Sequence, residues 1–262
     1  MPKLLFIETS TALCSTALAA DGKIICTRLS DTPRAHASQT AVFVKEMLDE
    51  CGLRASELDA VAVGMGPGSY TGLRVGVSTA KGICFGAGIP LIAVSTLDIL
   101  AWQAIDGGLL PEGCTAILPM IDARRMEVYT APYSPAGERL GEIAPVVLDE
   151  GSFADLLASG PVLVIGDAAD KFKQLTCQAV PTAFGRAMLG LSAPCGSQPS
   201  PLSVADSMER GPAAVFIQCC PEAAAMLTPA MRKYAKKEFE DVAYFEPFYL
   251  KQFIATTPKK LF

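Results

Sequence analysis

The predicted order of strands and helices occurs twice in this chain, and that repetition limits the fold more than any other feature of the sequence. In residues 1–108, apolar runs and turn residues predict three strands followed by helix, strand, helix, strand and helix. The second and third strands meet at Asp21-Gly22, a dipeptide typical of hairpin turns. Residues 109–262 repeat the order. The sequence therefore predicts an α/β protein of two βββαβαβα halves, 1–108 and 109–262.

A segment rich in proline and glycine interrupts the second half. Residues 177–212 contain five prolines and four glycines but only four charged residues. This composition is typical of loops rather than of regular elements. We therefore expect an insertion over about 177–212.

Composition limits the partners and the compartment. The net charge of -5 provides no broad basic surface, so contact with RNA would need the help of a partner protein. Nine cysteines without any C-x-x-C pair favour free buried thiols in a reducing compartment, and hence the cytoplasm. Glu8 ends the first apolar run after four residues, and prolines break the longest uncharged stretch. Neither a signal peptide nor a membrane span is predicted.

The single histidine excludes two kinds of catalytic site. A metal site of the H-E-x-x-H type needs two histidines, whereas this sequence has only His36. A catalytic triad would have to use His36, yet this residue precedes a predicted helix and no nucleophile-elbow motif occurs. We interpret His36 as a helix-entry or solvent-facing residue, and no metal site is predicted.

A glycine-rich block from Gly64 to Gly76 joins a predicted strand to a predicted helix. Helix N-termini of this kind can hold anions, but the block matches neither the P-loop nor the dinucleotide-binding motif. Proline restricts φ and glycine allows a sharp reversal, so the block predicts a shaped turn rather than a phosphate site. The turn residues are Gly66, Pro67, Gly68, Ser69, Tyr70 and Thr71.

An acidic residue ends the first strand of each half, Glu8 in the first and Asp122 in the second. Duplicated halves of this type resemble the RNase H-like superfamily of actin, sugar kinases and heat-shock chaperones, in which these positions face a magnesium nucleotide. Here Thr9 stands where a glycine would allow close approach, and the segment 123–126 is bulky. Vestigial nucleotide-cleft positions and ordinary strand-end carboxylates are equally open interpretations. No cofactor is predicted.

Several blocks of the chain resemble the TsaB family, which is also called YeaZ. The most specific is Gly66-Pro-Gly-Ser-Tyr-Thr-Gly-Leu-Arg74. The other matching blocks are Leu5–Thr11, Ala80–Gly82, Pro90–Leu97, Met120–Tyr129 and Phe245–Lys251. The resemblance covers most of the chain outside about 177–212. It departs at Glu8, where the family more often has aspartate.

The resemblance implies a role in bacterial tRNA modification. In that pathway, threonylcarbamoyl moves from its adenylate to N6 of adenosine 37, in tRNAs that read codons beginning with A. The paralogue TsaD performs the transfer with histidine metal ligands, TsaE supplies ATPase activity and TsaC makes the adenylate. This chain has Ser95–Leu100 at the matching place, without histidine. The resemblance therefore implies a non-catalytic scaffold that binds and activates TsaD, meets TsaE in the complex and contacts tRNA only through it.

Two alternative functions are weighed against the scaffold. An ATP-dependent kinase or phosphotransferase of the same superfamily is motivated by Glu8, Asp122 and the glycine block. A metallopeptidase is disfavoured by the single histidine. Binding of magnesium ATP to the isolated chain would separate the kinase from the scaffold.

One predicted partner surface lies on the helix that follows the glycine block, residues 71–86. Its small residues at i, i+4 and i+8 share one stripe, and small residues let a second helix approach closely. They are Gly72, Gly76 and Ala80. On this interpretation, the Gly76→Arg variant folds as a monomer and no longer co-purifies with TsaD.

A second predicted partner surface lies on the helix over residues 37–51. The predicted core stripe of this helix consists of Ala37, Ala41, Val44, Leu48 and Cys51. Thr40, Phe43 and Met47 lie together beside it. We expect both surfaces to contact TsaD, or a second copy of the chain when TsaD is absent.

Overall fold

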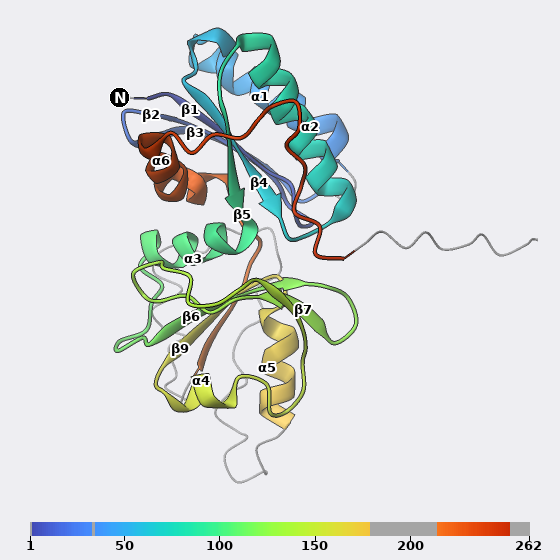
Figure 1. Ribbon diagram of the computed structural model, residues 1–262, viewed down its shortest axis with the longest axis vertical. Helices are drawn as coiled ribbons and strands as arrows, with labels where there is room; N and C mark the ends of the chain where they lie inside the picture. Colours follow the sequence, from blue (N-terminus) through green and yellow to red (C-terminus); the bar gives the residue numbers. More distant parts are fainter. Residues whose placement is uncertain (1, 33–34, 179–213, 252–262) are drawn as a thin grey trace, which may run out of the picture.

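The computed structural model describes residues 2–32, 35–178 and 214–251. They form two five-stranded sheets, one above the other in Figure 1, with helix α3 (Thr96–Asp106) between them. Nearly all of the predicted insertion at about 177–212 lies outside the described residues. Within the described ranges, no helix is both long enough and apolar enough to cross a membrane.

The first half forms a mixed sheet. Its strands are β1 (Leu4–Glu8), β2 (Cys14–Ala20), β3 (Lys23–Ser30), β4 (Ala60–Gly66) and β5 (Leu91–Ser95). Their order is β3-β2-β1-β4-β5, with β1 antiparallel to β2 and parallel to β4. Because β1 is covered on both faces, all five of its residues are buried, which explains its continuous apolar run.

The second half repeats this sheet. Its strands are β6 (Ala116–Asp122), β7 (Glu127–Thr130), β8 (Ala144–Val147), β9 (Val162–Gly166) and β10 (Ala214–Gln218). The order β8-β7-β6-β9-β10 places the five strands as in the first half. The predicted class of two RNase H-like halves is therefore confirmed.

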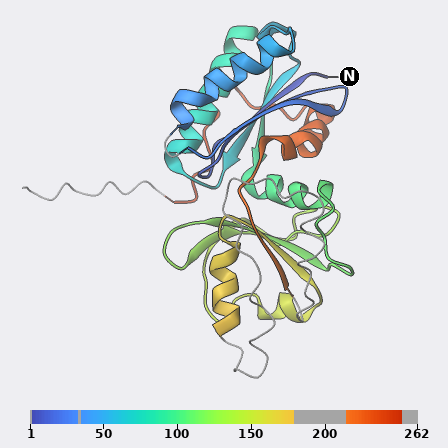
Figure 2. The same cartoon turned by 180° about the vertical axis from the view of Figure 1, so that it is seen from behind.

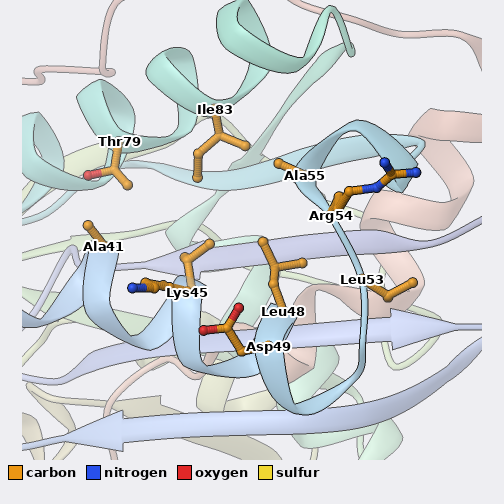
Figure 3. A pocket seen from close by; sticks show the side chains of 10 residues that line it. Ala41, Lys45, Leu48, Asp49, Leu53, Arg54, Ala55, Thr79 and Ile83 are labelled. Atoms are coloured by element: carbon orange, nitrogen blue, oxygen red, sulfur yellow. The ribbon is translucent and has the colours of Figure 1, made fainter.

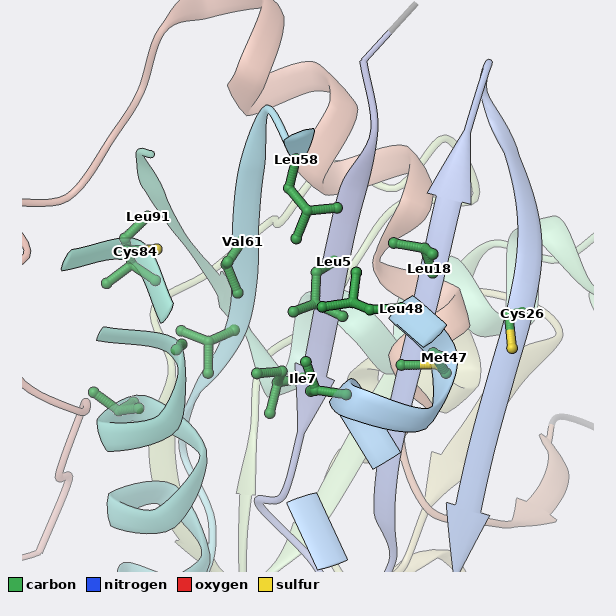
Figure 4. Packing of buried hydrophobic residues seen from close by; sticks show 14 residues of the cluster. Leu5, Ile7, Leu18, Cys26, Met47, Leu48, Leu58, Val61, Cys84 and Leu91 are labelled. Carbon is green, nitrogen blue, oxygen red and sulfur yellow. The ribbon is translucent and has the colours of Figure 1, made fainter. Parts of the chain in front are cut away.

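Two long helices cover one face of the first sheet. They are α1 (His36–Glu50) and α2 (Tyr70–Ala87), and a short 3-10 helix, η1 (Ala55–Glu57), lies between them in the chain. Figure 4 shows Leu5 and Val61 of the sheet in one cluster with Leu48 of α1 and Cys84 of α2. Burying this apolar surface holds both helices on the sheet.

The last helix of each half packs on the sheet of the other half. Leu97 and Leu100 of α3 join the core of the second sheet. The 3-10 helix η3 (Ala223–Met226) and α6 (Leu227–Lys236) instead pack on the first sheet, where Met226 and Ala230 join its core. Packing therefore crosses the predicted boundary between residues 1–108 and 109–262. The division of the chain into two domains at this boundary stays a prediction.

Two shorter helices complete the second half, α4 (Ala154–Ala158) and α5 (Ala169–Gln178). Phe172 of α5 is fully buried and meets Phe153 edge to face at 5.5 Å between ring centroids. Seven cysteines among the described residues are free thiols, and four of them, Cys14, Cys26, Cys84 and Cys220, are buried as expected.

Candidate functional site

The turn between β4 and α2 packs against the loop that follows β1. Ser69 caps α2, because its Oγ accepts a hydrogen bond from the Gly72 amide at 3.3 Å. Gly66 has a φ of +108°, and a Cβ on Gly68 would lie 2.4 Å from the carbonyl oxygen of Ser10. The glycines are therefore needed for a sharp reversal and for close backbone packing.

The small-residue stripe of α2 faces the protein's own core, so the prediction that it contacts a partner is wrong. Gly72, Gly76 and Ala80 are all buried. A Cβ on Gly72 would lie 2.0 Å from the carbonyl oxygen of Thr9, and one on Gly76 would lie 2.3 Å from the Thr9 hydroxyl oxygen. Thr9 Oγ1 also donates a hydrogen bond to the Gly72 carbonyl at 2.8 Å. The stripe packs against the loop after β1, which occupies the space that a second protein would need.

Helix α1 is also turned about its axis relative to the prediction. Thr40 and Met47 are fully buried instead of facing a partner, and Phe43 is half-buried. Met47 Sδ accepts a hydrogen bond from Thr16 Oγ1 at 3.8 Å, and Thr40 Oγ1 lies 3.4 Å from Cys14 Sγ. These partners on β2 place Thr40 and Met47 inside, so their assignment to a partner surface is wrong.

The outward faces of α1 and α2 form a groove that sequence reasoning missed (Figure 3). Ala41 and Lys45 line it from α1, and Thr79 and Ile83 line it from α2. Two hollows along it have volumes of about 410 and 460 Å³, and Thr79 lines both. The groove is lined by small and apolar side chains together with four charged ones, Lys45, Asp49, Arg54 and Arg74. The pair Ala37 and Ala41, one turn apart and both exposed, was the available signal, but the sequence interpretation placed both in the core.

His36 is the first residue of α1 and lies against the loop that follows β1. It is half-buried, and its Nε2 lies 3.0 Å from the carbonyl oxygen of Thr11. This position agrees with the helix-entry interpretation. In the part of the chain that the structure describes, no group of three histidine, cysteine or acidic residues could hold a metal ion.

Glu8 ends β1 and is fully buried. Its Oε1 accepts a hydrogen bond from the Ser10 amide at 2.6 Å, whereas Oε2 has no partner among the described residues. Oε2 fills the space over Gly64, where a Cβ would lie 2.0 Å away. Burial raises the pKa of Glu8 from 4.5 to about 7, and the hydrogen bonds from Ser10 offset this only in part. An enclosed carboxyl group of this kind is unsuited to Mg²⁺, which needs ionised, accessible oxygens.

Asp122 ends β6 in a different environment. It is exposed, and its Oδ1 accepts a hydrogen bond from Lys171 Nζ at 2.7 Å. Arg124 and Arg125 follow it with φ values of 71° and 51°, so bulky residues occupy the turn where phosphate would need bare backbone. The donors present do not fit a magnesium nucleotide. The geometry favours ordinary strand-end carboxylates for both acidic residues.

Glu8→Gln is expected to remove a pH-dependent loss of stability. As pH rises from 4.5 to about 7, the unfolded chain releases the Glu8 proton before the folded protein does. This one group therefore lowers the free energy of unfolding by about 3 kcal/mol across that interval. Glutamine keeps the bond from the Ser10 amide without the cost of ionisation.

The variant should exceed the wild type in stability at alkaline pH and match it more closely near the acid end of the interval. Urea unfolding of both proteins in a series of buffers across the interval measures the difference. Identical pH slopes for the two proteins would contradict the assignment of the buried carboxyl.

The duplicated sheet topology defines a class, the RNase H-like proteins of actin, chaperone and sugar-kinase type. A solved Pseudomonas aeruginosa structure, described as an uncharacterized protein with similarity to peptidase YEAZ, superposes with a TM-score of 0.73 at 27% identity. The superposition covers 96% of this chain and 100% of that one. A second structure, described as YeaZ from the same organism, has a TM-score of 0.70.

Sequence comparisons identify the family within this class. The family described as TsaD, tRNA N6-adenosine threonylcarbamoyltransferase, matches residues 30–257. The Bacillus subtilis tRNA threonylcarbamoyladenosine biosynthesis protein TsaB is 30% identical over 76% of this chain and 85% of its own length. The Escherichia coli protein of the same name is 39% identical, and the match spans 50% of this chain and about half, 54%, of that protein. The chain belongs to the TsaB (YeaZ) branch of this family.

Proposed function

We propose that this chain is a non-catalytic scaffold that binds and activates the TsaD transferase. The product of the complex is N6-threonylcarbamoyladenosine at position 37 of tRNAs that read codons beginning with A. Family membership supports the pathway, because the Bacillus subtilis and Escherichia coli relatives are named for threonylcarbamoyladenosine biosynthesis.

The open groove between α1 and α2 is the observation that carries the scaffold role. Ala41 and Thr79 face each other across it. Small side chains on two adjacent helices leave room for the ridges of two more helices. We therefore assign the groove, in place of the buried stripe, to TsaD. In the absence of TsaD, a second copy of the chain would use the same surface.

The environments of the two strand-end carboxyl groups support a role without catalysis. Glu8 is enclosed with a pKa raised by burial, and Asp122 is paired with Lys171. Neither carboxyl group is placed to hold a metal nucleotide against a substrate. With a net charge of -5, the chain would reach tRNA only through the complex, with TsaE as a further member, in the cytoplasm.

Reconstitution of the transfer tests this proposal. Purified TsaD, TsaE, magnesium ATP, threonylcarbamoyl-adenylate and unmodified tRNA are incubated with and without this chain, and the modified nucleoside is measured by mass spectrometry. Product should depend on the chain together with TsaD, and the chain alone should give none. If TsaD and TsaE modify the tRNA at full rate in the absence of this chain, the proposed scaffold role is wrong. Phosphoryl transfer from ATP by the isolated chain would instead favour the kinase alternative.

A further inference from the structure

The segment that follows α6 runs along the first half and reaches the level between the two halves at residues 248–251. In Figures 1 and 2 it runs from α6 to α2 and then descends along α2 to the level between the sheets. The Glu240 amide donates to the Leu91 carbonyl at 2.9 Å. Lys81 Nζ of α2 donates to the Ala243 carbonyl at 3.2 Å and to the Phe245 carbonyl at 3.0 Å. The segment is thus bound to the first half over most of its length.

Phe248 and Tyr249 bind the first half at the point where β4 leads into α2. The Phe248 amide donates to the Met65 carbonyl at 2.8 Å. The ring of Tyr249 lies against Tyr70, the first residue of α2, with 4.7 Å between centroids and 34° between planes. Arg74, one turn further along, lies over the Tyr70 ring at 5.4 Å.

The next two residues bind the second half. Leu250 packs against the core of the second sheet. Lys251 forms an ion pair with Glu127, and its Nζ lies 5.8 Å from the ring centroid of Tyr129, so both of its partners belong to β7. Four consecutive residues therefore hold the start of α2 on one side and β7 on the other.

We propose that residues 248–251 form a latch that closes the two halves on each other and opens to let them pivot about α3. The contacts on the α3 side are buried and apolar, since Leu97, Leu100 and Ala104 all lie inside the core of the second sheet. The latch instead depends on the Phe248 amide bond, the Tyr249–Tyr70 ring pair, the half-buried Leu250 and one ion pair. The side chains of that ion pair, Lys251 and Glu127, are 43% and 22% exposed. Weak, partly exposed contacts open before a buried core does. The latch is a property of the isolated chain and is tested without TsaD, although Tyr70 also lines one hollow of the groove.

Hydrogen exchange followed by mass spectrometry tests the latch in the full chain. In the double variant Tyr249→Ala, Lys251→Met, amides of the first turn of α2 and of β7 should exchange at least about fivefold faster, while those of α3 keep the wild-type rate. The control is Tyr244→Ala, Lys236→Met, which makes the same two changes at exposed sites outside the latch, one in the C-terminal segment and one at the end of α6. The control should exchange like the wild type.

Wild-type exchange in both regions of the double variant would overturn the latch. Faster exchange that includes α3 would also overturn it, because it would indicate a general loss of stability. A charge-reversal experiment distinguishes the effect of breaking the ion pair from the effect of removing the side chains. Lys251→Glu should open the latch, and adding Glu127→Lys should restore the wild-type rates. Failure of the reversed pair to restore them would show that the ion pair does not hold the halves together.

Discussion

Gly72→Ala is expected to destabilise the protein by about 3 kcal/mol, although alanine is the better helix former. The added Cβ would lie 2.0 Å from the Thr9 carbonyl oxygen, a backbone atom that cannot move aside like the end of a flexible side chain. Relief requires the loop after β1 to shift, which also disturbs the bond from Thr9 Oγ1 to the Gly72 carbonyl. Urea unfolding with a constant m-value measures the loss.

Gly82→Ala provides a matched control on the same helix. No atom lies within 4 Å of a Cβ at Gly82, so alanine gains helix propensity without a clash. We expect stabilisation of about 0.5–1 kcal/mol. If Gly72→Ala unfolds within 0.5 kcal/mol of the wild type, the close packing of the loop on α2 is wrong. Gly76→Arg, expected from the sequence to fold as a monomer, should now fail to fold because the Thr9 hydroxyl occupies the space.

The order of elements could be predicted because it depends on short apolar runs and local turn residues. β1 is buried along its whole length, and Asp21 and Gly22 both adopt the positive φ that a tight hairpin requires. The strand ends Glu8 and Asp122 were also placed correctly. Each of these features can be recognised within about ten residues of sequence.

The inward faces of α1 and α2 could not be predicted, because contacts distant in sequence decide them. Small residues occur on both sides of α2, as Gly76 and Gly82 show, so the hydrophobic pattern alone does not select a side. The choice is made by Thr9, which lies 63 residues away from its partner Gly72. On α1, Met47 is buried beside Thr16 of β2, a hydroxyl group that no helical periodicity reveals. The packing of α3 on the second sheet and of α6 on the first also depends on contacts between residues far apart in the sequence.

Thr79→Arg is expected to weaken binding to TsaD at least about 100-fold without changing the fold, on the proposal that the groove holds this partner. Thr79 lines both hollows of the groove, so a guanidinium there would lie where partner side chains must pack. Its hydroxyl donates only to the Val75 carbonyl of its own helix, and that carbonyl keeps its place in the helix after the change. The loss should therefore appear in the dissociation constant and not in the circular dichroism spectrum.

Thr176→Arg on α5 is the matched control for the groove variant. Thr176 is also a half-buried helical threonine whose hydroxyl bonds only within its own helix, to the Lys173 carbonyl at 3.0 Å and the Phe172 carbonyl at 3.3 Å. It lies in the second half, away from the groove, so the same change in charge and volume should leave TsaD affinity within about twofold of the wild type. Calorimetric titration of purified TsaD with each variant gives both constants. Equal losses of affinity in the two variants would indicate a general effect of the added arginine. Wild-type affinity of the Thr79→Arg variant would show that the groove is not part of the interface with TsaD. Only a selective loss at Thr79 fits a partner seated between α1 and α2, because such a partner must exclude water from both hollows at once.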